Sequence, residues 1–263
     1  MNASFRPELV IDGIAALAGE CRLKTVFEFS SAEDMRRGAE ILRFSCEAFA
    51  TAGALGGYAM AGRMYPEANI TVSGGVRTRE QQADVQFSVV SIDPKAFQFL
   101  RNMLGMLVAH NARLERIRVT AQDAPADGPV LLPTVGEGNE STAYPAMVVP
   151  PELFQLVWSD SQFSKTRRVI VEFHERPPAG LPGRLEPYVQ AWFGLLERGA
   201  FCAPFGLPFE AESVGGRLSL FDETCYEISI ARFVASEAGF RVLANMLGHF
   251  SRNVLAIARV EID

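Results

Sequence analysis

The chain has 263 residues, of which 48% are hydrophobic and 21% are charged, and its formal net charge is -6. This composition is that of an ordinary globular protein with room for one large domain or two small ones. The acidic balance argues against a nucleic-acid-binding protein, which concentrates Lys and Arg to meet phosphates. No apolar run approaches the roughly 20 residues that span a bilayer, and the N-terminus lacks a signal-peptide pattern, so we expect a cytoplasmic protein.

The predicted elements begin with an N-terminal extension, residues 1–20, in which residues 6–20 are expected to form a helix. Residues 24–30 (KTVFEFS) follow as a β-branched and aromatic run that predicts a strand. Ser31 and Asp34 have the spacing of a capping box, and apolar residues then recur at helical intervals. A strand and a helix therefore open the first half of the chain.

A hairpin, a second helix and a closing strand complete the first half. The alternating runs at 69–72 and 85–90 predict two paired strands with one covered face. Asp93 and Pro94 have the residue types of a helix start, and residues 114–119 predict the closing strand.

The second half repeats this order. Residues 97–105 (FQFLRNMLG) match 240–248 (FRVLANMLG), and the closing strand at 114–119 matches 257–262 in the same register. Such self-similarity indicates a duplicated unit. In the second copy, we expect Pro187 in the first turn of the first helix. The predicted elements of this copy are, in order, strand 168–174, helix 185–197, strands 217–220 and 227–233, a helix from residue 236 and strand 257–262.

The order strand, helix, strand, strand, helix, strand, twice over, predicts an α+β protein of two tandem ferredoxin-like repeats. Each repeat would have an antiparallel sheet with both helices on one face. The first repeat covers residues 21–119 and the second covers residues 167–263. Residues 120–166 are rich in Pro and Gly but also carry apolar residues, so we expect a packed connector with a strand or short helix at 152–158.

The residues that commonly carry catalysis or bind metals show no recognisable motif. His110, His174 and His249 occupy unrelated positions of the repeat, at no zinc-motif spacing. The glycine-rich stretches lack the pattern of a phosphate-binding loop. We therefore predict no catalytic residue, no cofactor and no metal. The cysteines form no CxxC pair and predict free thiols: Cys21, Cys46, Cys202 and Cys225.

Two polar positions recur in both copies. Glu28 and Glu172 could be paired carboxylates across a pseudo-twofold cleft, but alternation along a strand favours a solvated sheet face. Asn102 and Asn245 recur with a Gly three residues later, which favours close packing between elements over an active site.

The connector is the predicted interaction surface, because loops carry function and because Tyr and Trp are favoured at contacts. The other reading is that this segment only covers the core. The residues predicted to bind a partner are Asp123, Asp127, Glu137, Glu140, Tyr144, Trp158 and Asp160.

Four strings carry a family resemblance: RNMLG at 101–105, SKTRR at 164–168, LEPYV at 185–189 and IARVEI at 257–262. With them the chain resembles the immunity protein 52 group of bacteria. Such proteins are encoded beside polymorphic or type VI secreted toxins, often nucleases of restriction-endonuclease type. The resemblance implies a non-enzymatic immunity protein whose partner is a cognate toxin with a basic nuclease domain, without direct nucleic-acid contact.

Two other classes stay open. A small-molecule enzyme or sensor would hold its ligand between the two repeats, with Glu28, Glu172, His174 and His249 converging on the pocket. A structural assembly subunit would use free sheet edges to oligomerise. The sequence leaves the oligomeric state open.

Overall fold

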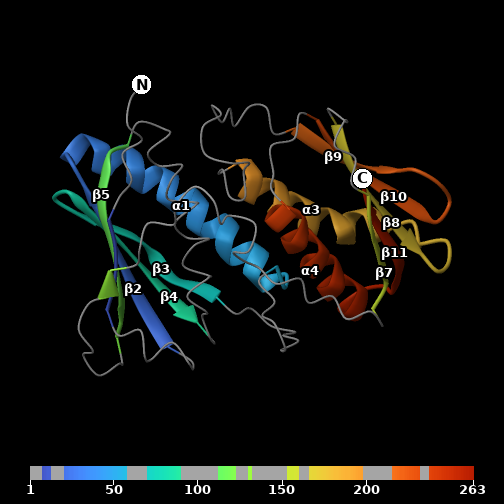
Figure 1. The fold of residues 1–263 in the computed structure, drawn as a ribbon, viewed down its shortest axis with the longest axis horizontal. Helices are drawn as coiled ribbons and strands as arrows, with labels where there is room; N and C mark the ends of the chain where they lie inside the picture. The colour runs from blue at the N-terminus through green and yellow to red at the C-terminus, as the bar shows by residue number, and fades with distance from the viewer. Residues whose placement is uncertain are drawn as a thin grey trace. The chain divides into compact units, whose positions relative to one another are not determined.

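The computed structural model describes residues 8–12, 21–57, 70–89, 112–122, 130–131, 153–159, 166–197, 215–231 and 237–263. The chain divides into two compact units. Unit 1 comprises residues 1–54 and 68–144, and unit 2 comprises residues 55–67 and 145–263. Each unit has one β-sheet with helical cover on one face (Figure 1). The described part of the chain is therefore α+β, with two sheets and three helices.

Unit 1 is built on a six-stranded sheet with the order β3-β4-β2-β5-β1-β6. The central strand β2 pairs antiparallel with both β4 and β5. Helix α1 lies along one face of this sheet, against β2, β3 and β4 (Figure 1). The elements are β1 (Glu8–Asp12), β2 (Cys21–Phe29), α1 (Ala32–Ala54), β3 (Ile70–Arg79), β4 (Gln82–Val89), β5 (Leu114–Ala121) and β6 (Val130–Leu131).

Strict alternation along β2 produces the core of unit 1. Leu23, Phe27 and Phe29 are buried on the face that α1 covers, whereas Lys24 and Glu28 between them are half-buried on the other face. Burial of each such apolar side chain contributes about 1.5–3 kcal/mol. The predicted strand is therefore correct, and its period fixes which face receives the helix.

The predicted cap of α1 is confirmed at Ser31, although the Asp34 carboxylate meets the Ser31 hydroxyl and not, as in a capping box, the Ser31 backbone N–H. The backbone N–H of Asp34 donates to Ser31 Oγ at 3.0 Å, and that hydroxyl donates to Asp34 Oδ2 at 2.6 Å. The Asp34 carboxylate also accepts the backbone N–H of Arg113 at 3.2 Å. The hydrogen bond from Ser31, followed by the one from Arg113, lowers the pKa of Asp34 below its usual value. The cap residues therefore connect the start of α1 to Arg113, the residue directly before β5.

Unit 2 is built on a five-stranded sheet with the order β7-β11-β8-β10-β9. Helices α3 and α4 pack side by side on one face of it (Figure 1). The Trp192 indole donates to the backbone oxygen of Gly239 at 2.8 Å and so joins the two helices inside the core. The elements are β7 (Gln155–Trp158), β8 (Thr166–Phe173), α3 (Leu181–Glu197), β9 (Gly215–Leu220), β10 (Cys225–Ala231), α4 (Glu237–Asn253) and β11 (Ile257–Ile262).

The predicted strands, hairpins and helices of the two repeats that fall on described residues are present in both units. The hairpins are β3-β4 and β9-β10, and the element expected at 152–158 is the strand β7. The repeated strands also take equivalent places, with β5, β2, β4, β3 in one sheet and β11, β8, β10, β9 in the other. The second helix of the first copy, predicted from Asp93, lies outside the described residues.

Two predictions about the sheets are wrong. The sheets are not purely antiparallel, because β1 pairs parallel with β5 and β7 pairs parallel with β11. Residues 8–12, placed in an N-terminal helix by the sequence analysis, form strand β1 instead. Strands β1 and β7, which are added to the predicted sheets, are each separated in sequence from their partner strand by most of a repeat. This separation gives the chain the long crossover connection that parallel pairing needs. The added strand therefore occupies the same position in both units.

The position of Pro187 is also different from the prediction. Helix α3 begins at Leu181, so Pro187 lies inside the helix and not in its first turn. Proline has no N–H to donate to the carbonyl of Gly183, four residues earlier. Gly183 itself is exposed, at the start of the helix.

Candidate functional site

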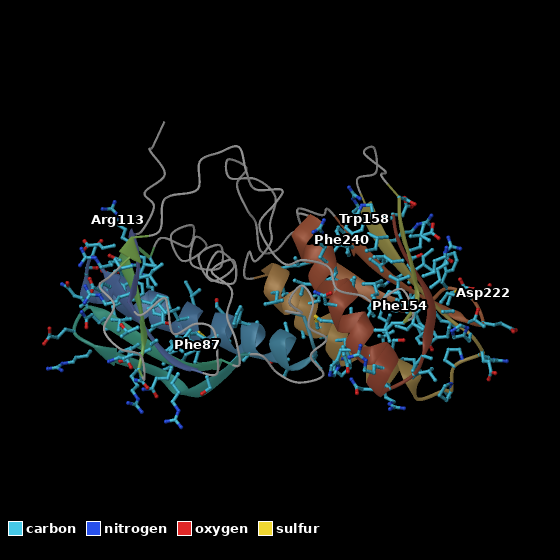
Figure 2. The ribbon with its side chains drawn as sticks, turned by 60° about the horizontal axis from the view of Figure 1, so that its bottom comes forward. Phe87, Arg113, Phe154, Trp158, Asp222 and Phe240 are labelled. Atoms are coloured by element: carbon cyan, nitrogen blue, oxygen red, sulfur yellow. The ribbon has the colours of Figure 1, made fainter. Side chains whose placement is uncertain are left out.

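Among the residues predicted to bind a partner, Trp158 is described. It lies at the end of β7 with 37% of its surface exposed, and its ring meets Phe240 of α4 edge-on at 5.8 Å (Figure 2). Part of this side chain therefore serves the core and part faces solvent. The predicted residues outside the described part of the chain are Asp123, Asp127, Glu137, Glu140, Tyr144 and Asp160.

His249 joins the two helices of unit 2. Its Nδ1 and the hydroxyl of Tyr188 on α3 are hydrogen-bonded at 3.0 Å, and burial raises the pKa of Tyr188. His174 lies exposed just after β8, and His110 lies outside the described residues. The described histidines are thus apart, one between two helices and the other on the surface.

Asn245 fastens a distant segment to α4. Its side chain is 4% exposed and its Nδ2 donates to the backbone oxygen of Gly57 at 3.3 Å. The neighbouring Gly56 has φ +81°, and a Cβ there would lie 2.7 Å from the Cβ of His249. Residues 55–57 therefore approach α4 closely, which agrees with the packing role predicted for Asn245. Asn102 lies outside the described residues.

The repeated glutamates face repeated arginines across neighbouring strands. Glu28 is the cross-strand partner of Arg116, and Glu172 is that of Arg259. The first pair approaches to 3.7 Å between nitrogen and oxygen, whereas Arg259 binds Glu261 at 2.6 Å. Opposite charges at such positions stabilise a sheet by about 0.2–1 kcal/mol, so sheet pairing accounts for Glu28. Glu172 is half-buried opposite Arg259, whose guanidinium binds Glu261 instead.

The polar groups considered for a ligand pocket do not gather within unit 2. Phe173 is buried on the helix-covered face of β8 and meets Phe250 of α4 at 6.3 Å. Glu172 precedes it and points to the opposite face, because side chains alternate along a strand. His249 belongs to α4, so Glu172 and His249 lie on opposite sides of the sheet.

The side chains of two of the four cysteines are described. Cys46 and Cys225 are free thiols, and burial raises the pKa of Cys46 to about 12. The side chains of Cys21 and Cys202 are outside the described set. No group of three or more His, Cys, Asp or Glu residues that could hold a metal ion occurs within the described ranges. None of the described helices is long and apolar enough to cross a membrane.

Two exposed apolar residues in the described part of unit 2 were not among the predicted site residues. Leu220 and Phe221, at the turn between β9 and β10, are 64% and 55% exposed, and the next residues, Asp222 and Glu223, are also exposed. We call residues 220–224 the hairpin tip. The sequence signal for this exposed site was Phe221 in the turn of a predicted hairpin, because Gly, Pro, Asn, Asp and Ser normally dominate such turns.

No family model matches the chain, and no curated protein matches it. Among solved structures, the chain aligns with a proposed glycine cleavage system transcriptional repressor at 10% identity, covering 93% of this chain and 96% of that chain, with a TM-score of 0.20. It also aligns with the ferredoxin protease FusC in complex with Arabidopsis ferredoxin at 8% identity, covering 93% of this chain and 34% of that chain, with a TM-score of 0.21. For pitrilysin the identity is 9%, the coverage 95% and 38%, and the TM-score 0.20. Similarities this weak assign neither a family nor an activity.

Proposed function

We propose that this chain is a non-enzymatic bacterial immunity protein that binds a cognate secreted toxin in the cytoplasm and neutralises it. The toxin is a nuclease with a basic surface. The proposal combines the resemblance to the immunity protein 52 group with the distribution of the residues that the two copies share.

The observation that carries the proposal is that the shared residues serve packing and pairing within each unit. Phe29 and Phe173 occupy the same place in the repeat and are 1% and 2% exposed. Leu114 and Ile257, the first residues of the closing strands, are both fully buried. A duplicated core of this kind supports a scaffold whose partner contacts lie where the copies differ.

We also propose that each unit is a ferredoxin-like fold extended beyond its closing strand, by β1 and β6 in unit 1 and by β7 in unit 2. The equivalent places of β5, β2, β4, β3 and of β11, β8, β10, β9 support this assignment. The added strands β1 and β7 extend both sheets on the same side of the repeat. The duplicated unit would then begin upstream of its first ferredoxin-like strand.

Opposite charge supports the choice of partner. A chain with net charge -6 would be steered toward a basic nuclease surface, and such steering raises the association rate. The predicted connector residues remain one proposed contact surface. Neutralising Asp123, Asp127, Glu137 and Glu140 together should slow association with the toxin, and an unchanged association rate would remove the connector from the interface.

Co-expression with the neighbouring reading frame tests the proposed function directly. The neighbour alone should arrest bacterial growth, and this chain should restore growth and co-purify with the neighbour as a complex. A harmless neighbour that forms no complex would contradict the proposal. A small-molecule activity of the purified chain that does not require a protein partner would instead favour the enzyme or sensor alternative.

A further inference from the structure

The hairpin tip presents two adjacent large apolar side chains to solvent. Among the described residues, the large apolar side chains that are exposed are Phe44, Trp158, Leu220 and Phe221. Trp158 already contacts Phe240 of the core. Leu220 and Phe221 are consecutive and are the two most exposed members of this set. Adjacent exposed apolar side chains rimmed by polar residues are a feature of protein contact sites.

The backbone of the hairpin tip is held in place by hydrogen bonds. The N–H of Phe221 donates to the oxygen of Cys225 at 2.9 Å, and the N–H of Cys225 donates to the oxygen of Asp222 at 3.2 Å. The N–H of Phe173 donates to the oxygen of Thr224 at 3.0 Å, which ties the tip to β8. A preorganised backbone lowers the entropy that a contact must overcome, so the tip is suited to inserting into a partner.

The negative charge of the hairpin tip indicates what kind of surface it would bind. The exposed carboxylates Asp222 and Glu223 directly follow the apolar pair, and Figure 2 shows Asp222 at the outer edge of unit 2, away from α3 and α4. Two carboxylates next to an apolar pair repel nucleic-acid phosphates and anionic lipid, and they attract Lys and Arg. The complementary surface is an apolar depression with a basic rim.

The other copy of the repeat provides an internal comparison. Its hairpin turns at Glu80 and Gln81, which are both exposed and polar, and Glu80 has φ 53°. Its flanking residues, Arg79 and Gln82, are polar as well. The apolar pair is thus absent from the corresponding turn of unit 1, although the two hairpins hold equivalent places in their sheets. A feature present in one copy and absent from the other is not required by the fold.

We infer that the hairpin tip docks into an apolar depression with a basic rim on the toxin, with Leu220 and Phe221 as anchors and with Asp222 and Glu223 facing the rim. This inference rests on the proposed function and places a toxin contact on unit 2, outside the predicted connector. Large side chains that become fully desolvated at the centre of an interface dominate binding energy. The carboxylates mainly raise the association rate.

The test compares tip variants with matched controls against the purified product of the neighbouring toxin reading frame. Leu220→Ser combined with Phe221→Ser should weaken the complex by about 100-fold. Asp222→Asn combined with Glu223→Gln should slow association and reduce its dependence on salt. The controls are Phe44→Ser, which removes an exposed apolar side chain elsewhere, and Gln81→Ser in the other hairpin. Both controls should bind within about threefold of the original chain, as expected for residues outside the contact. Circular dichroism and thermal melting of each variant confirm folding.

Three outcomes separate the possibilities. If the original chain binds the toxin and the apolar tip variant binds equally well, the inference is wrong and the proposed function stands. If the original chain neither binds nor protects against the neighbour, both are wrong. If the original chain is a dimer in light scattering and the tip variant is a monomer, the occupant of the tip is a second copy of this chain, which overturns the inference.

Discussion

Gly38 on α1 and Gly183 on α3 allow one substitution to be compared in two environments. A Cβ at Gly38 would lie 2.2 Å from Cε1 and 2.4 Å from Cζ of Phe29, whereas a Cβ at Gly183 would meet open space. Both changes to Ala gain helix propensity, up to about 1 kcal/mol. Phe29 is 1% exposed, so its ring cannot move aside without disturbing the core of unit 1. Such overpacking typically costs about 1–3 kcal/mol.

We therefore expect Gly183→Ala to stabilise the protein and Gly38→Ala to have no benefit or to destabilise it, with a difference of about 1–3 kcal/mol in the free energy of unfolding. Urea unfolding followed by far-UV circular dichroism measures both. The two tryptophans, Trp158 and Trp192, belong to unit 2, so their fluorescence reports unit 2 alone.

Removing the obstructing ring supplies the control. In a Phe29→Leu background, Gly38→Ala should recover at least part of its helix-propensity gain, because the two positions are in contact and their effects should not add. The reasoning would be refuted if Gly38→Ala stabilised the original chain as much as Gly183→Ala does, with an unchanged dependence on urea.

Two further predictions concern α1. Ser31→Ala should cost about 1 kcal/mol near neutral pH through loss of the cap. The pKa of Asp34 is lowered in the folded state, so its charged form stabilises the fold above pH 3.8, and this contribution is lost as the pH falls through the folded-state pKa. The cost of Ser31→Ala should therefore shrink in acid. Urea midpoints measured across this pH range test this expectation, and a cost that does not change with pH would contradict it. The Cys46 thiol, with a pKa of about 12, should resist iodoacetamide at about pH 8 until the protein unfolds, whereas the half-exposed Cys225 should react before Cys46 does. Peptide mass mapping checks the order, and equal labelling rates would contradict it.

The elements that the sequence predicts well are those with local physical signals. Strand β2 follows from the β-branched and aromatic run at residues 24–30, and α1 begins at the predicted cap residue Ser31. These signals depend on neighbours a few residues away and are visible without a partner element. The duplication strengthens these local signals, because each secondary-structure assignment in one copy supports the same assignment in the other.

The features that the sequence analysis missed depend on distant parts of the chain. Whether residues 8–12 form a strand depends on β5 offering an edge for pairing, which no local period encodes. The start of α3 at Leu181 was missed because Pro182 and Gly183 are typical of turns, although Pro also fits a first helical turn. Leu220 and Phe221 are exposed, although apolar residues of this kind are buried in many folds. Their exposure depends on which parts of the sheet the helices cover, and the local sequence does not encode that.

The contact between Asn245 and Gly57 has a consequence for synthesis of the chain. The two residues belong to the same unit but are 188 positions apart. At ribosomal rates of about 5–20 residues per second, Gly57 is made about 10–40 s before Asn245. During that interval the segment after α1 lacks the helix surface on which it finally rests. Unit 2 therefore cannot be completed from the second half of the chain alone, because it includes a segment that is translated with the first half.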